Sequence, residues 1–177
     1  LELPGETHVA FVRSEKAHAD LLSINVSRAA TVLGVITVLT GAELKADGIG
    51  GIPWEIWPVM EKKEEDSDIE LGDPQISRPQ PAMATDRVVF VGQIVAMVIA
   101  ESMDSALDGA EAVAVTYREL PNVTRVEDAV LKGAPTIDPM FPDNVCFKMA
   151  VGDKQKTDSV FGAAGVLREL FELVAMS

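Results

Sequence analysis

The chain has 177 residues, of which 47% are hydrophobic and 24% are charged. This length and composition are typical of one folded domain with a sizeable core, and they exclude wholesale disorder. The 28 acidic and 15 basic side chains give a formal net charge of -13, which repels the phosphates of nucleic acids and anionic membrane surfaces. We therefore expect no nucleic-acid partner.

Three further features concern membrane insertion, the start of the chain and the redox state of its cellular compartment. The longest strongly apolar stretch, residues 88–100, is too short to span a bilayer and contains Gly92 and Gln93, which predicts no membrane insertion. The opening Leu1-Glu2-Leu3-Pro4-Gly5 has neither Met nor a secretory signal, so we expect a piece of a longer polypeptide. A lone Cys146 cannot form an internal disulfide, which favours a reducing, cytoplasmic location.

The first 45 residues predict short strands with a turn of helix between them. Loose apolar alternation indicates a strand at residues 8–14, and a β-branched run predicts another at residues 35–39. Between them, residues 23–26 look extended. Ser27 then caps a short helix, which Gly34 ends by tolerating a left-handed backbone.

Residues 46–83 predict a long loop or insert, because glycines and prolines interrupt every periodicity. The charge run within it, at residues 61–68, indicates a solvated surface segment. A divalent-cation site built from Glu64, Asp66 and Asp68 would lack the glycine and the distal glutamate of a calcium loop, so none is predicted.

The second half of the chain carries the densest core signal. Residues 87–90 and 94–100 predict two buried strands joined by a bend at Gly92-Gln93. Ser102 caps a helix whose apolar residues recur at helical spacing. We expect four more elements: a strand at 113–117, a helix at 126–131 closed by Gly133, a strand at 144–149, and a helix from about residue 157 onward. The irregular order of strands and helices predicts the α+β class.

The side chains offer no complete catalytic or metal-binding set. A nucleophilic hydrolase needs a histidine beside its serine or cysteine, and neither His8 nor His18 lies in a nucleophile motif. Cys146 lies in an apolar segment, which favours a buried structural thiol. Two histidines fall short of a zinc site, and one cysteine falls short of an iron–sulfur cluster. We therefore predict no catalytic, cofactor-binding or metal-binding residue in this chain.

Trp54 and Trp57 are candidate interface residues of the long loop, because tryptophan is enriched where proteins meet partners. The alternative, that both side chains fold back over the edge of the core, has equal weight. The sequence does not decide between the two.

Two blocks of sequence resemble a known family. Residues 8–19 read HVAFVRSEKAHA, and residues 84–96 read ATDRVVFVGQIVA. The first block is similar to the opening of the α/β-hammerhead domain in the molybdopterin-binding large subunit of xanthine dehydrogenase, aldehyde oxidase and carbon monoxide dehydrogenase. The second is similar to that domain's Tyr-Val-Gly-Gln-Pro-Val-Ala strand and bend. Glu15 and Ile94 stand where the family has proline, and the likeness continues to about residue 161.

The resemblance implies an α/β-hammerhead domain over residues 1–161, with a mixed sheet and a few short helices, followed by a tail at 162–177 that departs from the family. It implies a non-catalytic structural and interface domain of a molybdenum hydroxylase, an oxidoreductase that holds molybdopterin, iron–sulfur clusters and FAD elsewhere in the complex. The expected partners are the downstream molybdenum-binding domain and the iron–sulfur module or subunit. Arg13 and Gln93, at a strand end and a bend, are the residues expected to make polar contacts with them.

A second hypothesis is a stand-alone interaction or carrier-like module without enzymatic activity, since hammerhead domains resemble biotinyl and lipoyl carriers. A carrier needs an exposed lysine at a tight hairpin tip. Lys62 and Lys63 lie in the charged loop and Lys132 follows a predicted helix, so the sequence lacks that feature.

Overall fold

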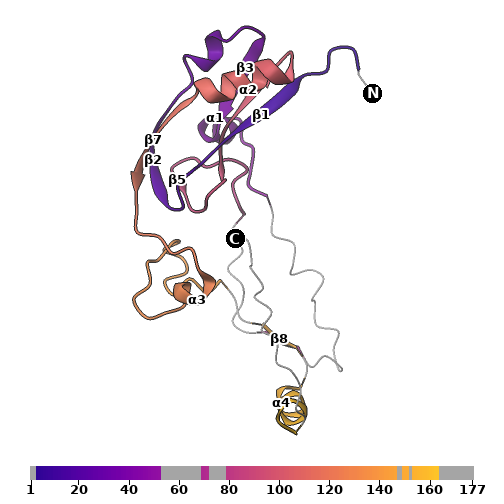
Figure 1. Cartoon of the computed structure of the whole chain (residues 1–177), viewed down its shortest axis with the longest axis vertical. Helices are drawn as coiled ribbons and strands as arrows, with labels where there is room; N and C mark the ends of the chain where they lie inside the picture. Colours follow the sequence, from indigo (N-terminus) through magenta and orange to yellow (C-terminus); the bar gives the residue numbers. More distant parts are fainter. Residues whose placement is uncertain (1–2, 53–68, 72–78, 147–148, 152, 164–177) are drawn as a thin grey trace.

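The computed structural model describes residues 3–52, 69–71, 79–146, 149–151 and 153–163 (Figure 1). Within them, short strands and helices alternate irregularly, which confirms the predicted α+β class. In chain order the elements are β1 (His8–Arg13), β2 (Ala19–Asn25), a 3-10 helix η1 (Ala29–Thr31), β3 (Val35–Thr40), α1 (Gly41–Ala46), β4 (Ile69–Leu71), β5 (Arg87–Val88), β6 (Ile94–Ala100), α2 (Met103–Ala112), β7 (Ala114–Glu119), α3 (Val126–Ala129), β8 (Met149–Val151) and α4 (Lys154–Ala163).

The described strands form two three-stranded sheets and one pair, and every pairing between them is antiparallel. The first sheet has the order β1-β6-β3, and the second sheet has the order β5-β2-β7. The strand β6 is central, with β1 and β3 paired to its two edges, and it is apolar along its whole length. The remaining pair joins β4 to β8.

Helix α2 packs on one face of the first sheet. Small residues allow this close approach: Ala106 is fully buried against Ala10 and Ala100 of the sheet. A Cβ atom added at Gly109 would lie 2.7 Å from Val98 Cγ1, closer than real side chains approach. The glycine in α2 is therefore a packing requirement of this helix–sheet contact.

The other hydrophobic cluster contains residues of the second sheet together with Val95 of β6 and Val12 of β1. Its fully or almost fully buried members are Ala19, Ala84, Val88 and Val95, so both predicted core strands, 87–90 and 94–100, contribute to it. The bend predicted between these strands is present, with Gly92 at a φ of 90°. The first of the two strands is shorter than predicted, ending at Val88.

Local signals in the sequence located some helix ends and missed others. Ser102 caps α2 as predicted, its Oγ accepting a hydrogen bond from the Ser105 N–H at 3.1 Å. Gly34 has the predicted left-handed backbone, with a φ of 85°. The predicted Ser27 cap is wrong, because the helical turn η1 begins one residue later, after Arg28, and has no side-chain cap.

The prediction of a strand at 144–149 is wrong at its start. Asn144 has a φ of 57°, and its side-chain amide donates to the carbonyls of Ala129 and Pro135, both at 2.9 Å. These bonds hold a turn in place of extended chain, and among the described residues the strand β8 covers Met149–Val151. Cys146 is exposed, so the predicted burial of its thiol is also wrong.

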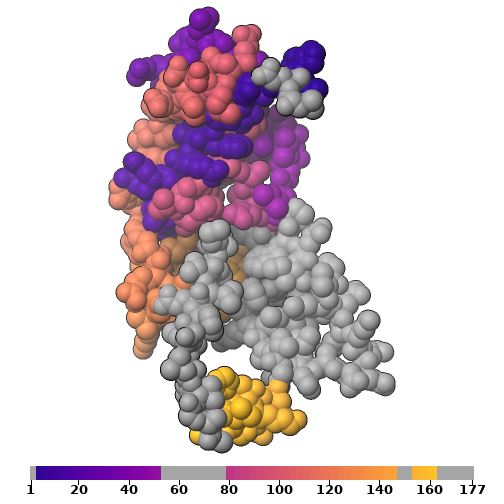
Figure 2. Space-filling view, turned by 45° about the vertical axis from the view of Figure 1, so that its right-hand side comes forward, coloured from indigo at the N-terminus to yellow at the C-terminus, as the bar shows by residue number. Residues whose placement is uncertain are grey.

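Helix α4 lies at the far end of the molecule from α2, and the yellow atoms of α4 are well separated from the two sheets (Figures 1 and 2). The predicted boundary between residues 161 and 162 falls inside this helix. The segment 46–83 includes β4, which pairs with β8. Trp54, Trp57, the charge run at 61–68 and residues 164–177 lie outside the described residues.

Candidate functional site

The bend between β5 and β6 is where the predicted interface residues Arg13 and Gln93 meet. The Arg13 guanidinium is exposed and donates to the Gly92 carbonyl at 2.9 Å. Gln93 is only 6% exposed, and its side-chain oxygen accepts the Val89 N–H at 2.8 Å. The structure thus brings the two residues together at one bend but leaves only Arg13 open to solvent.

Main-chain bonds lock this bend to the end of β1. The Ser14 N–H donates to the Gln93 carbonyl at 2.9 Å, and the Gly92 N–H donates to the Ser14 carbonyl at 2.7 Å. Ser14 itself is buried. The two blocks of sequence that carry the family resemblance, 8–19 and 84–96, are therefore joined directly, and the residues at the join hold the backbone in place.

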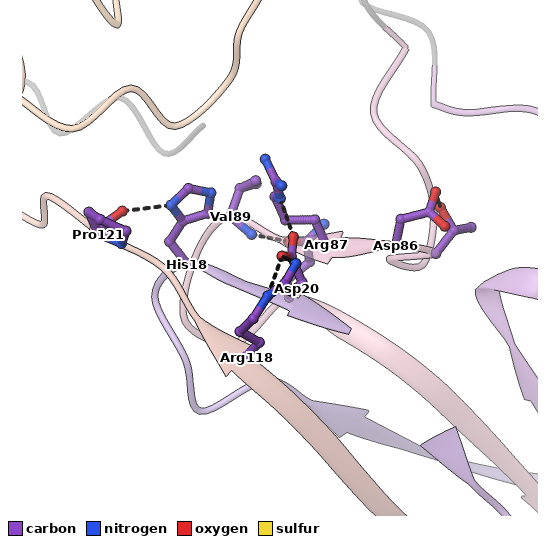
Figure 3. A network of polar contacts seen from close by, with 9 residues as sticks. His18, Asp20, Asp86, Arg87, Val89, Arg118 and Pro121 are labelled. Atoms are coloured by element: carbon purple, nitrogen blue, oxygen red, sulfur yellow. Dashed lines mark hydrogen bonds and ion pairs between the residues drawn. The ribbon is translucent and has the colours of Figure 1, made fainter. Parts of the chain in front are cut away.

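A row of three charged side chains, one carboxylate between two arginines, crosses the second sheet, and no sequence motif predicted it. Asp20 on β2 pairs in register with Arg87 on β5 and with Arg118 on β7. Its oxygens lie 2.8 Å from Arg87 Nε and 2.6 Å from Arg118 Nη2 (Figure 3). Hydrogen bonds from Arg118 and then Arg87 lower the pKa of Asp20 below its ordinary value. No local motif marks such a row, because its members meet only after three strands have paired.

His18 lies beside this row and points toward the end of β7. The residue is 4% exposed, and its Nδ1 lies 2.7 Å from the Pro121 carbonyl oxygen (Figure 3). A carbonyl can only accept, so Nδ1 carries the proton. Nε2 is buried without a hydrogen-bond partner among the described residues. The ring fastens the segment after β7 to the start of β2, with no hydroxyl or thiol bonded to it.

The contacts of these side chains are those of residues that stabilise the fold. Asp20, His18 and Gln93 each bond to their own neighbouring strands or turns. Across the described part of the chain, no three His, Cys, Asp or Glu side chains gather in a way that could hold a metal ion. The donors among these described residues therefore do not fit a metal centre. Lys132 follows α3 and does not join two strands, which leaves it without the geometry of a carrier lysine.

Comparison with known proteins identifies the family. Residues 1–121 match the family model described as "Aldehyde oxidase and xanthine dehydrogenase, a/b hammerhead domain". The chain belongs to this family. The predicted hammerhead fold is thereby confirmed, and the match includes the bend, the Asp20 row and His18.

Individual relatives agree with this assignment. The carbon monoxide dehydrogenase large chain of Afipia carboxidovorans is 31% identical over 94% of this chain and 20% of its own length. The solved structure of quinoline 2-oxidoreductase from Pseudomonas putida 86 has a TM-score of 0.64 and 36% identity, over 79% of this chain and 16% of that one. A Cu,Mo-CO dehydrogenase structure has a TM-score of 0.65 and 29% identity, covering 94% of this chain and 20% of that one.

The hammerhead chain thus spans 16–20% of the length of these relatives. None of the helices in the described segments is both long enough and apolar enough to cross a bilayer.

Proposed function

We propose that this chain is a non-catalytic structural and interface domain of a molybdenum hydroxylase large chain. Two observations together support the proposal: the share of a relative's length that the chain covers, and the hydrogen bonding of its polar side chains. The chain corresponds to 20% of the carbon monoxide dehydrogenase large chain that it resembles, while its buried His18 and Gln93 and its half-buried Asp20 bond to its own strands and turns. Such a domain supports and positions a neighbour, which performs the reaction.

In this proposal the complete enzyme is a cytoplasmic oxidoreductase that carries molybdopterin, iron–sulfur clusters and FAD outside this domain. Its partners are the molybdenum-binding domain and the iron–sulfur module or subunit. Arg13, Trp54 and Trp57 contact these partners. Gln93 contributes by holding the bend, since its buried amide oxygen fixes the Val89 N–H beside Arg13.

The test begins with an affinity tag placed on the gene at its chromosomal position in the source organism. The assembly is purified through the tag, its polypeptides are identified by mass spectrometry, and molybdenum, iron and flavin are measured. We expect sequence similar to the remaining four fifths of the carbon monoxide dehydrogenase large chain on the same polypeptide as this domain, together with molybdenum. The isolated 177-residue chain serves as the control and is expected to bind none of the three groups. A purified polypeptide without that additional sequence, or turnover by the isolated chain, contradicts the proposal.

A further inference from the structure

The first sheet has one face that α2 does not cover. Strand registers place six side chains on it in two rows: Val9, Ile99 and Thr37 in one, and Phe11, Met97 and Leu39 in the other. We call this set the open face. Because side chains alternate along a strand, the opposite face carries Ala10, Val98 and Ala100, which α2 covers.

The open face is apolar and accessible. Five of its six side chains are hydrophobic, and none of the six belongs to either hydrophobic cluster of the domain. Phe11 is 46% exposed and Val9 is 38% exposed, while Leu39, Met97 and Ile99 are half-buried. Removing such apolar side chains from water is favourable, so a partner that covers this face would be stabilised by it.

A charged group borders this apolar surface. The Arg13 guanidinium carbon lies 5.6 Å from the centre of the Phe11 ring, within range of a cation–π contact. Arg13 is exposed, so part of its donor capacity remains available beside the rings. The fitting occupant therefore has aliphatic or aromatic side chains and a carboxylate or carbonyl oxygen placed for Arg13.

We propose that the open face is the docking surface for the remaining part of a molybdenum hydroxylase large chain. This inference rests on the proposed function and adds the surface through which it acts. The length outside the domain supports it, since this chain corresponds to 20% of the carbon monoxide dehydrogenase large chain. Parts of one large chain are held at high effective concentration, so even a small contact surface between them is populated.

A second copy of the chain fits the open face less well. A fully buried aromatic side chain removes about 150–250 Å² from water. The open face has one aromatic side chain and five smaller ones, all already partly covered, so it offers only about a few hundred Å² of contact surface. A stable interface between separate proteins buries about 800 Å² on each partner. Each copy also carries a net charge of -13, which opposes self-association.

The test measures side-chain accessibility by hydroxyl-radical footprinting in two samples. One is the isolated 177-residue chain, and the other is the assembly purified from the source organism through the chromosomal tag. Phe11 is compared with Phe161 on α4, a residue of the same type that is 43% exposed. We expect Phe11 oxidation to fall about fivefold or more in the assembly, as for a side chain moved into an interface core, with Phe161 little changed.

Matched substitutions complete the test. Phe11→Lys places a charge on the open face, whereas Phe161→Lys places the same charge on α4, and urea midpoints of both isolated chains check their folding. In the Phe11→Lys assembly we expect Met97 to oxidise as fast as in the isolated chain, and in the Phe161→Lys assembly to be protected as in the wild type.

Each other outcome has a defined meaning. Absence of the remaining large-chain sequence from the assembly refutes the proposed function and, with it, this inference. Its presence with Phe11 still accessible, or with Phe161→Lys equally disruptive, refutes the docking surface alone. Slow Phe11 oxidation already in the isolated chain shows that the chain covers the face itself. Dimers in sedimentation equilibrium that Phe11→Lys abolishes show that a second copy covers it. Either of these two results overturns the inference.

Discussion

Replacing Gly109 by alanine tests the close packing of α2 on the first sheet. The glycine lies inside α2, and a Cβ atom built there would lie 2.7 Å from Val98 Cγ1 and 2.9 Å from Val35 Cγ2. Ordinary van der Waals contacts between carbons are about 3.5–4.0 Å. The added methyl group must therefore push the helix away from the sheet or move both valines.

Two effects oppose each other in this variant. Alanine is favoured over glycine inside a helix by about 1 kcal/mol. Overpacking a well-filled core costs about 1–3 kcal/mol. Val98 is fully buried on the central strand β6, and valine has no flexible end that could swing aside. The overlap should thus lie in the upper part of its range, and we expect Gly109→Ala to lower the free energy of unfolding by about 1–2 kcal/mol.

Urea unfolding followed by far-ultraviolet circular dichroism measures this change. The matched control is Gly162→Ala in α4, where an added Cβ would meet no atom within 4 Å. That control should be neutral or should stabilise by up to about 1 kcal/mol. A Gly109→Ala chain as stable as the wild type, or more stable, would refute the close-packing argument.

Three further predictions concern polar groups. The two arginines lower the folded-state pKa of Asp20. Its ion pairs therefore contribute stability above about pH 4, and this stability is lost as the pH falls through the lowered pKa. Asp20→Asn should lower the urea midpoint at pH 7, and the difference from the wild type should shrink in acid. A deficit independent of pH contradicts this. Gln93→Leu leaves a main-chain N–H without its acceptor and should cost about 1–3 kcal/mol in urea unfolding, whereas Gln155→Leu on the exposed surface of α4 should stay within about 0.5 kcal/mol. Partial burial, and to a smaller extent two nearby carboxylates, raise the pKa of the exposed Cys146 thiol. The pH dependence of its alkylation by iodoacetamide should therefore have a midpoint above about pH 8.5, and Asp143→Asn should lower that midpoint. An unchanged midpoint in this variant would contradict the electrostatic contribution of Asp143.

Local chemistry explains why much of the fold could be predicted from the sequence. The Ser102 cap, the left-handed Gly34 and the bend at Gly92 each depend on the intrinsic geometry of one or two residues. The same is true of the apolar strand 94–100, which is recognisable without knowing its neighbours. These features are set within a few positions of the chain, so the sequence alone carries them.

Features that depend on distant partners were missed. The Asp20 row forms only when β5 and β7 pair with β2, and the residues that meet are 67 and 98 positions apart. Asn144 stopped a predicted strand through bonds to Ala129 and Pro135, carbonyls that strand propensity does not consider. Exposure of Cys146 follows from that turn. The Asp20 row and the turn at Asn144 share one cause, which is a tertiary contact that local sequence preferences do not reveal.

The placement of side chains on the first sheet inverts the usual order of burial by size. Ala10 is 6% exposed, whereas its neighbour Phe11 is 46% exposed, although burying the larger side chain would remove far more apolar surface from water. Alternation in the sequence separates the two faces without saying which one is covered. The covered face is the one with small side chains, because α2 approaches it through Gly109 and Ala106. Helix α2 therefore covers the small residues, and the large apolar side chains of the open face stay partly exposed to water. Burying them against another surface is favourable, which is the physical basis for expecting a partner on the open face.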